Sequence, residues 1–217
     1  MRLSFFVMPL GELKKEAVRR SLTLFNSVPF VRLVVLSGSC AKGTAREESD
    51  IDIIIGADEG RVWTARFFSL LFADARGVRN KGGWSMDMLC MSLFVSRSEF
   101  RMSDPENDYE RELYPYLYPV YGEEDAISDF ASANKGLVSD GFISRRDIFL
   151  GYMKDSTAKL IERVLSGGFG DAMERFFRRF QTTRISRHMA DISVGHHRMR
   201  IILSPSRVET HFRVDLG

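Results

Sequence analysis

The stretch Val31–Ile55, VRLVVLSGSCAKGTAREESDIDIII, contains two apolar runs joined by a turn that is rich in small residues. Continuous apolar and β-branched runs such as Phe30–Leu36 and Ile51–Ile55 are typical of strands that are buried on both faces. Asp50 and Asp52 stand where the second run begins. Because alternate residues of a strand project to the same face, these two carboxylates are expected on one side of a sheet.

The carboxylate pair indicates a metal site. Two ionised carboxylates at the start of a buried strand cannot both lose their hydration shells without a compensating cation. Mg²⁺ accepts hard oxygen ligands and keeps its remaining positions for water and substrate phosphate. Asp50 and Asp52 are therefore candidate Mg²⁺ ligands, with Mn²⁺ as an alternative ion. A lone Asp-x-Asp is a weak signal, since aspartates often begin strands or cap turns.

The turn between the two runs has the composition of a phosphate-binding segment. Gly38 allows a backbone to approach phosphate closely, and Ser39 offers a hydroxyl and an N–H group at the start of a short helix. Lys42 and Arg46 can add positive charge for a polyphosphate. The turn is not a P-loop, because Thr44 stands where the P-loop lysine belongs and no long helix follows.

Taken together, GSCAKGTAREESDIDIII resembles the signature of the DNA polymerase β-type nucleotidyltransferase superfamily, and most closely its small stand-alone domains. Their pattern is G-S-x-A-x-G-x-A-x-x-x-S-D-I-D, in which Lys42 stands where Arg is frequent. The resemblance implies that Gly38, Ser39, Lys42 and Ser49 bind the nucleotide and that Asp50 and Asp52 bind magnesium. The residues that match the pattern are Gly38, Ser39, Ala41, Gly43, Ala45, Ser49, Asp50, Ile51 and Asp52.

The resemblance also implies a third carboxylate on a later strand, where it acts as a metal ligand and helps to deprotonate the attacking hydroxyl. In WSMDMLCM the candidate is Asp87, a single acid in an apolar run that we expect to form a strand from Trp84 to Val95. The alternatives are an edge-strand aspartate that faces water, or Asp74 as the third ligand. Asp74 is expected at a solvent-exposed helix end, so Asp87 is preferred.

The expected fold is α+β, with a small mixed sheet flanked by helices and followed by a mostly helical C-terminal region. We expect a catalytic nucleotidyltransferase domain at residues 1–100 and a mainly helical acceptor-binding or partner region at 101–217. Beyond residue 100 the sequence gives no further strand signal. The expected helices span Pro9–Asn26, Glu59–Ala75, a segment ending near Pro115, Glu123–Asn134, Ser144–Leu165 and Asp171–Met189.

The last of these helices carries an aromatic and basic pattern. Phe176, Phe177 and Phe180 are expected in the core. Their Arg neighbours are expected on a solvated face, with contact to an anionic partner as the alternative. The four histidines do not have the spacing of a zinc site.

Composition excludes several classes of protein. A net charge of +2 gives no overall case for nucleic-acid binding. Two cysteines, Cys40 and Cys90, are too few for a disulfide framework and favour a cytoplasmic location. No apolar run approaches the roughly 20 residues of a membrane span, so we expect no membrane partner.

The expected function is transfer of a nucleoside monophosphate, with AMP from ATP as the first choice, to an acceptor hydroxyl with release of pyrophosphate. The acceptor is left open among small molecules, proteins and RNA, and a homodimer is also left open. The alternatives are an antitoxin-like regulatory nucleotidyltransferase that acts on a partner protein, and a non-catalytic nucleotide-binding module.

Overall fold

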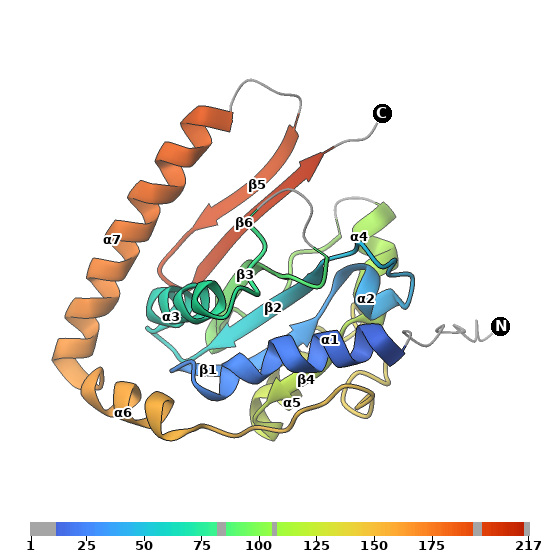
Figure 1. Ribbon diagram of the computed structural model, residues 1–217, viewed down its shortest axis with the longest axis horizontal. Helices are drawn as coiled ribbons and strands as arrows, with labels where there is room; N and C mark the ends of the chain where they lie inside the picture. The colour runs from blue at the N-terminus through green and yellow to red at the C-terminus, as the bar shows by residue number, and fades with distance from the viewer. Residues whose placement is uncertain (1–11, 82–85, 106–107, 193–196, 215–217) are drawn as a thin grey trace.

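A computed structural model describes residues 12–81, 86–105, 108–192 and 197–214. Its centre is a six-stranded sheet of order β4-β1-β2-β3-β6-β5 (Figure 1). β2 and β3 run parallel, and the other neighbouring strands pair antiparallel. The strands are β1 Val31–Leu36, β2 Ile51–Ala57, β3 Leu89–Ser96, β4 Tyr118–Gly122, β5 His197–Leu203 and β6 Arg207–Val214.

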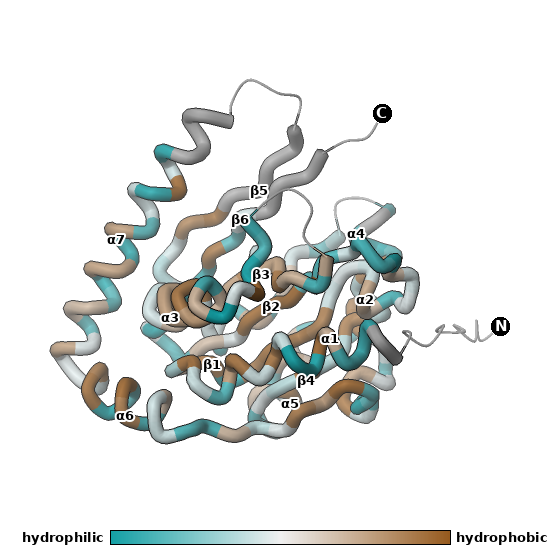
Figure 2. Tube along the Cα trace, in the orientation of Figure 1, coloured by the Kyte–Doolittle hydropathy of each residue, from teal (hydrophilic) through white to brown (hydrophobic). Residues whose placement is uncertain are grey.

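Apolar side chains lie on both faces of the sheet, which explains the continuous apolar runs. On β1, Val34 and Leu36 belong to one buried cluster, whereas Leu33 and Val35 belong to a second cluster on the other face. In Figure 2 the hydrophobic colour follows the inner strands and α3. The helices are α1 Glu12–Leu22, α2 Gly38–Lys42, α3 Val62–Ala75, α4 Asp108–Leu113, α5 Glu124–Ala133, α6 Ser156–Val164 and α7 Gly167–Ile192.

The α+β class and the helical C-terminal region are confirmed, but three strands after residue 100 were not expected. β4 and the β5–β6 hairpin extend the sheet at its two edges. The expected helix Ser144–Leu165 is wrong over its first half, because α6 begins at Ser156. Gly151 adopts a φ of 73°, which a right-handed helix does not contain, and the Asp155 carboxylate caps α6 by accepting a bond of 3.0 Å from the Ala158 N–H.

Segments from both sides of residue 100 share the sheet, and the boundary near that residue stays a prediction. Arg32 of β1 illustrates the connection between them. Its guanidinium pairs with Glu162 of α6 at 3.2 Å and with Glu123 at 3.8 Å, as well as with Asp58 at 2.6 Å. No helix in the described ranges is long and apolar enough to cross a membrane.

A buried lysine lies close to this cluster. Lys154 is 8% exposed, and its ammonium donates to the backbone carbonyls of Val28 and Phe25. Burial lowers the pKa of Lys154 from 10.5 to about 7, and Arg32 acts in the same direction. The folded protein therefore releases this proton at a lower pH than the unfolded chain does.

This difference predicts a pH-dependent stability. Between pH 7 and pH 10 the unfolded chain binds the Lys154 proton and the folded protein does not, so the free energy of unfolding rises with pH, by up to about 1.4 kcal/mol per pH unit. Urea denaturation of the wild type and of Lys154→Met at pH 7.5 and 9.0 measures the effect. The wild type should gain more stability over this interval than Lys154→Met. Equal gains would show that Lys154 does not titrate in this range.

Candidate functional site

The two aspartates of the opening stretch meet a cysteine from the neighbouring strand. Asp50 precedes β2, Asp52 lies on it, and Cys90 of β3 is the register partner of Asp52 in the parallel pair. One potential ligand atom from each of these three residues lies within 4.8 Å of the others. The pairing of β2 with β3 therefore creates a compact cluster of metal-ligating groups.

The electrostatics of the cluster favour a cation. Burial, together with the neighbouring Asp50 carboxylate, raises the pKa of Asp52 to about 6, and a hydrogen bond from the Cys90 thiol opposes both effects. The pKa of the Cys90 thiol is also raised, first by burial and then by the charges of Asp52 and Asp50. Without a cation, the buried carboxylate is therefore costly to ionise and the thiol stays protonated.

Asn80 orients Asp50. Its side-chain amide donates to Asp50 Oδ2 at 2.9 Å, and its own backbone N–H donates to the Leu89 carbonyl at 3.0 Å. Asn80 thus joins the loop after α3 to the start of β3 and to the carboxylate. Neither Asn80 nor Cys90 was a candidate from the sequence. A polar residue in a basic loop and a cysteine in an apolar strand give no pattern of their own, and only the strand pairing brings them to the aspartates.

Gly38 lies directly against Asp52. It has a φ of +66°, and a Cβ added to it would lie 2.1 Å from Asp52 Oδ2. The neighbouring Ser37 N–H donates to the Asp52 carbonyl at 2.9 Å, and the Cys40 thiol donates to the Asp50 carbonyl at 3.3 Å. The start of α2 and the start of β2 are therefore held together, and the phosphate-binding turn expected from the sequence adjoins the carboxylates.

The other expected nucleotide-binding residues flank this junction. Ser39 is half-buried in α2, and its carbonyl accepts the Thr44 N–H at 3.0 Å. Lys42 ends α2 and pairs with Glu112 of α4 at 2.8 Å. The Ser49 hydroxyl accepts a bond of 2.9 Å from the backbone N–H of Arg46, which shapes the turn before Asp50.

Asp87 lies outside the strand in which the sequence placed it. β3 begins at Leu89, and Asp87 occupies a turn with a φ of 59°, a left-handed conformation that strands do not contain. Its carboxylate pairs with Lys14 of α1 at 2.6 Å, and Lys14 also donates to the Ser49 carbonyl. The strand position beside Asp52, where a third carboxylate was expected, is occupied by Cys90. Expecting Asp87 in a strand was wrong, and its role as a metal ligand stays a prediction.

Asp74, the alternative to Asp87 as the third metal ligand, lies at the exposed end of α3, as the sequence predicted. The Asp74 carboxylate pairs with Arg79 at 2.8 Å and with Lys81 at 3.0 Å. Burial opposes these two cations, yet together they lower the pKa of Asp74. The basic loop after α3 therefore neutralises this carboxylate.

The donor set fits a divalent cation. The carboxylates of Asp50 and Asp52 are the oxygen ligands that Mg²⁺ and Mn²⁺ prefer, and the raised pKa of Asp52 is the cost that such an ion relieves. The Cys90 sulfur is a soft donor that suits Zn²⁺ better than Mg²⁺. The carboxylates of Asp50 and Asp52 are thus suited to hold the ion, and the Cys90 thiol donates a hydrogen bond to Asp52.

Comparison with known proteins gives one result that bears on this site. A family model described as a nucleotidyltransferase domain matches residues 14–113. The matched segment begins at Lys14, contains Gly38, Asp52 and Cys90, and ends with α4. No curated protein matches the chain.

Proposed function

Because residues 14–113 match a family model described as a nucleotidyltransferase domain, consistent with the polymerase β-type superfamily, we propose that the protein transfers a nucleoside monophosphate from a nucleoside triphosphate to an acceptor hydroxyl. ATP is the proposed donor and pyrophosphate the leaving group. The observation that carries this proposal is the contact between the Gly38 turn and the Asp52 carboxylate, since it joins a phosphate-binding backbone to a metal ligand.

The proposed roles follow from the positions of the side chains. Asp50 and Asp52 hold the divalent ion, and Asn80 fixes the orientation of Asp50 through its bond of 2.9 Å. Gly38 and Ser39 receive the β- and γ-phosphates through the backbone at the start of α2. When bound, the cation stabilises the charge that develops on the α-phosphate.

In the transfer step, the acceptor oxygen forms a bond to the α-phosphorus as the bond to the bridging oxygen of the β-phosphate breaks. The hydroxyl proton leaves to a base, and Asp87 is the carboxylate that we propose for this role and as the third metal ligand. Its present partner is Lys14 at 2.6 Å. For Asp87 to accept the proton or bind the ion, this ion pair has to open or rearrange.

Labelled triphosphates test the proposal. The protein is incubated with Mg²⁺, a cell extract as the source of acceptor, and ATP labelled on either the α- or the γ-phosphate. Transfer of a nucleoside monophosphate places the α-label on the acceptor and the γ-label in pyrophosphate. Label from the γ-phosphate on the acceptor would indicate phosphoryl transfer and contradict the proposal. Parallel reactions with CTP, GTP and UTP identify the preferred base.

One observation favours a second candidate, a non-catalytic nucleotide-binding module. The strand position beside Asp52 carries Cys90, and the Asp87 carboxylate is paired with Lys14. If the third carboxylate does not reach the metal, the site binds the triphosphate without transferring it. Magnesium-dependent ATP binding by calorimetry, together with no labelled acceptor from any triphosphate, would support this second function.

Substitution of Cys90 by Asp tests how complete the metal site is. A carboxylate at the register partner of Asp52 adds a third hard ligand, so Mg²⁺ affinity should rise by about tenfold or more. Cys90→Asn is the matched control, because it is close in size to Asp and lacks the charge. The measurement is the increase in melting temperature with Mg²⁺ concentration. Equal increases for both variants would mean that this strand position does not face the ion.

A cytoplasmic location is part of the proposal, and the free thiols of Cys40 and Cys90 are consistent with it.

A further inference from the structure

The outward face of α7 is distinct from the site described above and lies outside the segment that the family model matches. The inward face fixes the helix to α3. Phe177 is 6% exposed and stacks on Phe67 at 4.2 Å, and Gln181 bonds to Arg66 at 2.7 Å and to the Trp63 carbonyl at 2.8 Å. The expectation that the aromatic stripe is core holds for Phe177 alone among its three rings.

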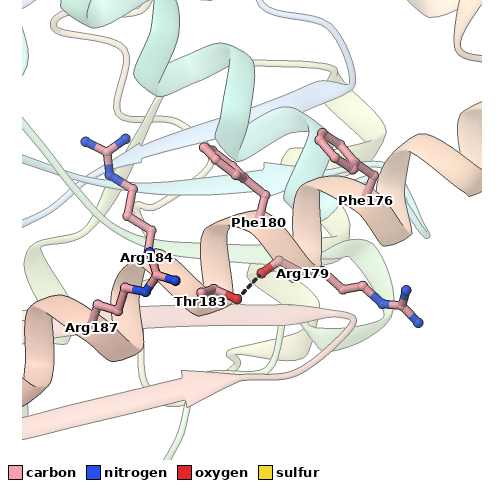
Figure 3. A pocket seen from close by; sticks show the side chains of 6 residues that line it. All are labelled: Phe176, Arg179, Phe180, Thr183, Arg184 and Arg187. Carbon is pink, nitrogen blue, oxygen red and sulfur yellow. Dashed lines mark hydrogen bonds between the residues drawn. The ribbon is translucent and has the colours of Figure 1, made fainter.

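The two neighbouring rings face solvent. Phe176 is 57% exposed and Phe180 is 46% exposed, and their rings are nearly parallel, with an interplanar angle of 10° and centroids 6.3 Å apart. They line a depression of about 620 Å³ along the helix. Figure 3 shows both rings and the Arg184 side chain projecting from the same side of α7. We name this surface the outer face of α7; it consists of Phe176, Arg179, Phe180, Thr183, Arg184 and Arg187.

The outer face is strongly basic. Residues 175–190 include five arginines and no aspartate or glutamate. Within the part of the chain that the structure describes, no carboxylate pairs with Arg179, Arg184 or Arg187. The acids at the start of α7 are already engaged: Asp171 pairs with Arg61 at 2.8 Å, and Glu174 accepts bonds from α3. The positive charge is therefore uncompensated in the described part of the chain.

The strands beside α7 add basic positions. Figure 1 shows the β5–β6 hairpin running alongside the C-terminal half of the helix. Arg198 of β5 is the register partner of Arg213 of β6, and Arg200 follows two residues later on β5. The basic segment therefore continues along the chain beyond the helix itself.

From these features we propose that the outer face of α7 binds single-stranded nucleic acid. Exposed aromatic rings offer stacking surfaces to unpaired bases, and guanidinium groups bind phosphate through two parallel hydrogen bonds. A membrane surface fits less well, because an interfacial helix buries a broad apolar face, and here two rings alternate with Arg and Thr. The proposal concerns binding alone and does not require nucleotidyl transfer, so either proposal can fail without the other.

Fluorescence anisotropy of the full chain with a labelled 20-nucleotide oligo(U) RNA tests the proposal, in the absence of triphosphate and metal. Binding should be detectable and should weaken with salt. If three arginines contact phosphate, the slope of log K against log[salt] should be about −2. Single-stranded DNA of the same length should bind as well, since stacking and phosphate contacts are common to both, and a blunt duplex should bind more weakly.

Two sets of variants separate the two kinds of contact. Phe176→Ala with Phe180→Ala should weaken binding by about tenfold or more and leave the salt slope unchanged. Arg184→Gln with Arg187→Gln should weaken binding and reduce the magnitude of the slope by about 1.4. Leu160→Ala with Arg163→Gln on the exposed surface of α6 is the control and should bind as the wild type does.

Melting temperatures show that each variant is folded, and all these side chains are exposed, so folding should persist. No binding to either oligonucleotide would overturn the proposal, as would equal binding by the wild type and both variant sets. Vesicles of phosphatidylcholine with 30% phosphatidylserine provide the competing surface. Binding to these vesicles that depends on Phe176 and Phe180, without oligonucleotide binding, would assign the outer face to membranes instead.

Discussion

Replacement of Asp52 by Asn is expected to lower nucleotidyl transfer by about 10³-fold or more while leaving the protein folded. The carboxylate is the part of the proposed metal site that lies closest to the Gly38 turn. Metal-ion stabilisation of the transition state is worth several kcal/mol, and about 4 kcal/mol corresponds to 10³-fold in rate. The measurement is the initial rate of α-label transfer at saturating ATP and Mg²⁺.

The same substitution should not destabilise the metal-free protein. Burial and the neighbouring Asp50 raise the pKa of Asp52 to about 6, so ionisation of this carboxylate opposes folding at neutral pH. A neutral amide removes that cost, and the melting temperature without metal should stay equal or rise. Asp74→Asn is the matched control, because Asp74 pairs with Arg79 and Lys81 at the end of α3, and it should retain activity. Full activity in Asp52→Asn would refute the metal role.

Replacement of Gly38 by Ala is expected to abolish magnesium-dependent ATP binding and to destabilise the fold by about 2–4 kcal/mol. Two costs combine at this position. A residue with a side chain is strained at a φ of +66°, by about 1–2 kcal/mol, and its Cβ would lie 2.1 Å from Asp52 Oδ2. The carboxylate has to move, which displaces a metal ligand.

Gly77→Ala separates these two costs. Gly77 has the same φ of +66°, and a Cβ there would meet nothing within 4 Å. The Gly77→Ala variant should lose only the stability that corresponds to the strain of a side chain at this φ, and it should keep magnesium-dependent ATP binding. Urea denaturation and calorimetric ATP titration of both variants provide the comparison. If Gly38→Ala resembled Gly77→Ala in both measurements, the close approach of Gly38 to Asp52 would have no functional consequence.

The strands that form the site could be predicted because their information is local. The apolar runs of β1 and β2 are buried on both faces, and the aspartates at the start of β2 interrupt a pattern that otherwise needs no charge. The glycine before α2 and the left-handed Gly43 after it are likewise signals of short range. For these elements the residues alone dictate the conformation.

The remaining parts of the site depend on pairing between distant segments. Cys90 lies beside Asp52 because β2 and β3 are parallel and in a particular register, and no local pattern determines that register. Asp87 was placed in a strand because its neighbours are apolar, but its ion pair with Lys14 accompanies a left-handed turn. Lys14 lies on α1, more than seventy residues earlier, and a helical pattern does not show which loop such a lysine contacts.

The strands after residue 100 escaped prediction for a similar reason. β4 reads YPVYG, in which a proline is tolerated because the strand lies at an edge of the sheet. β5 and β6 are rich in Arg and lack the continuous apolar run of a central strand. β5 pairs with β6, and β6 pairs with β3; this pairing, and not their composition, gives the two segments strand structure.

The position of β6 has a consequence for the order in which the protein assembles during synthesis. β3 pairs with β2 on one side and with β6 on the other, and β6 begins only at Arg207. A nascent chain can bring Gly38, Asp52 and Cys90 together well before the ribosome has made the last strand. Until then one side of β3 presents unpaired backbone groups, an open edge to which other chains can add. Pairing of β6 with β3 closes this edge, so the backbone groups beside the site become satisfied only when the β5–β6 hairpin has formed.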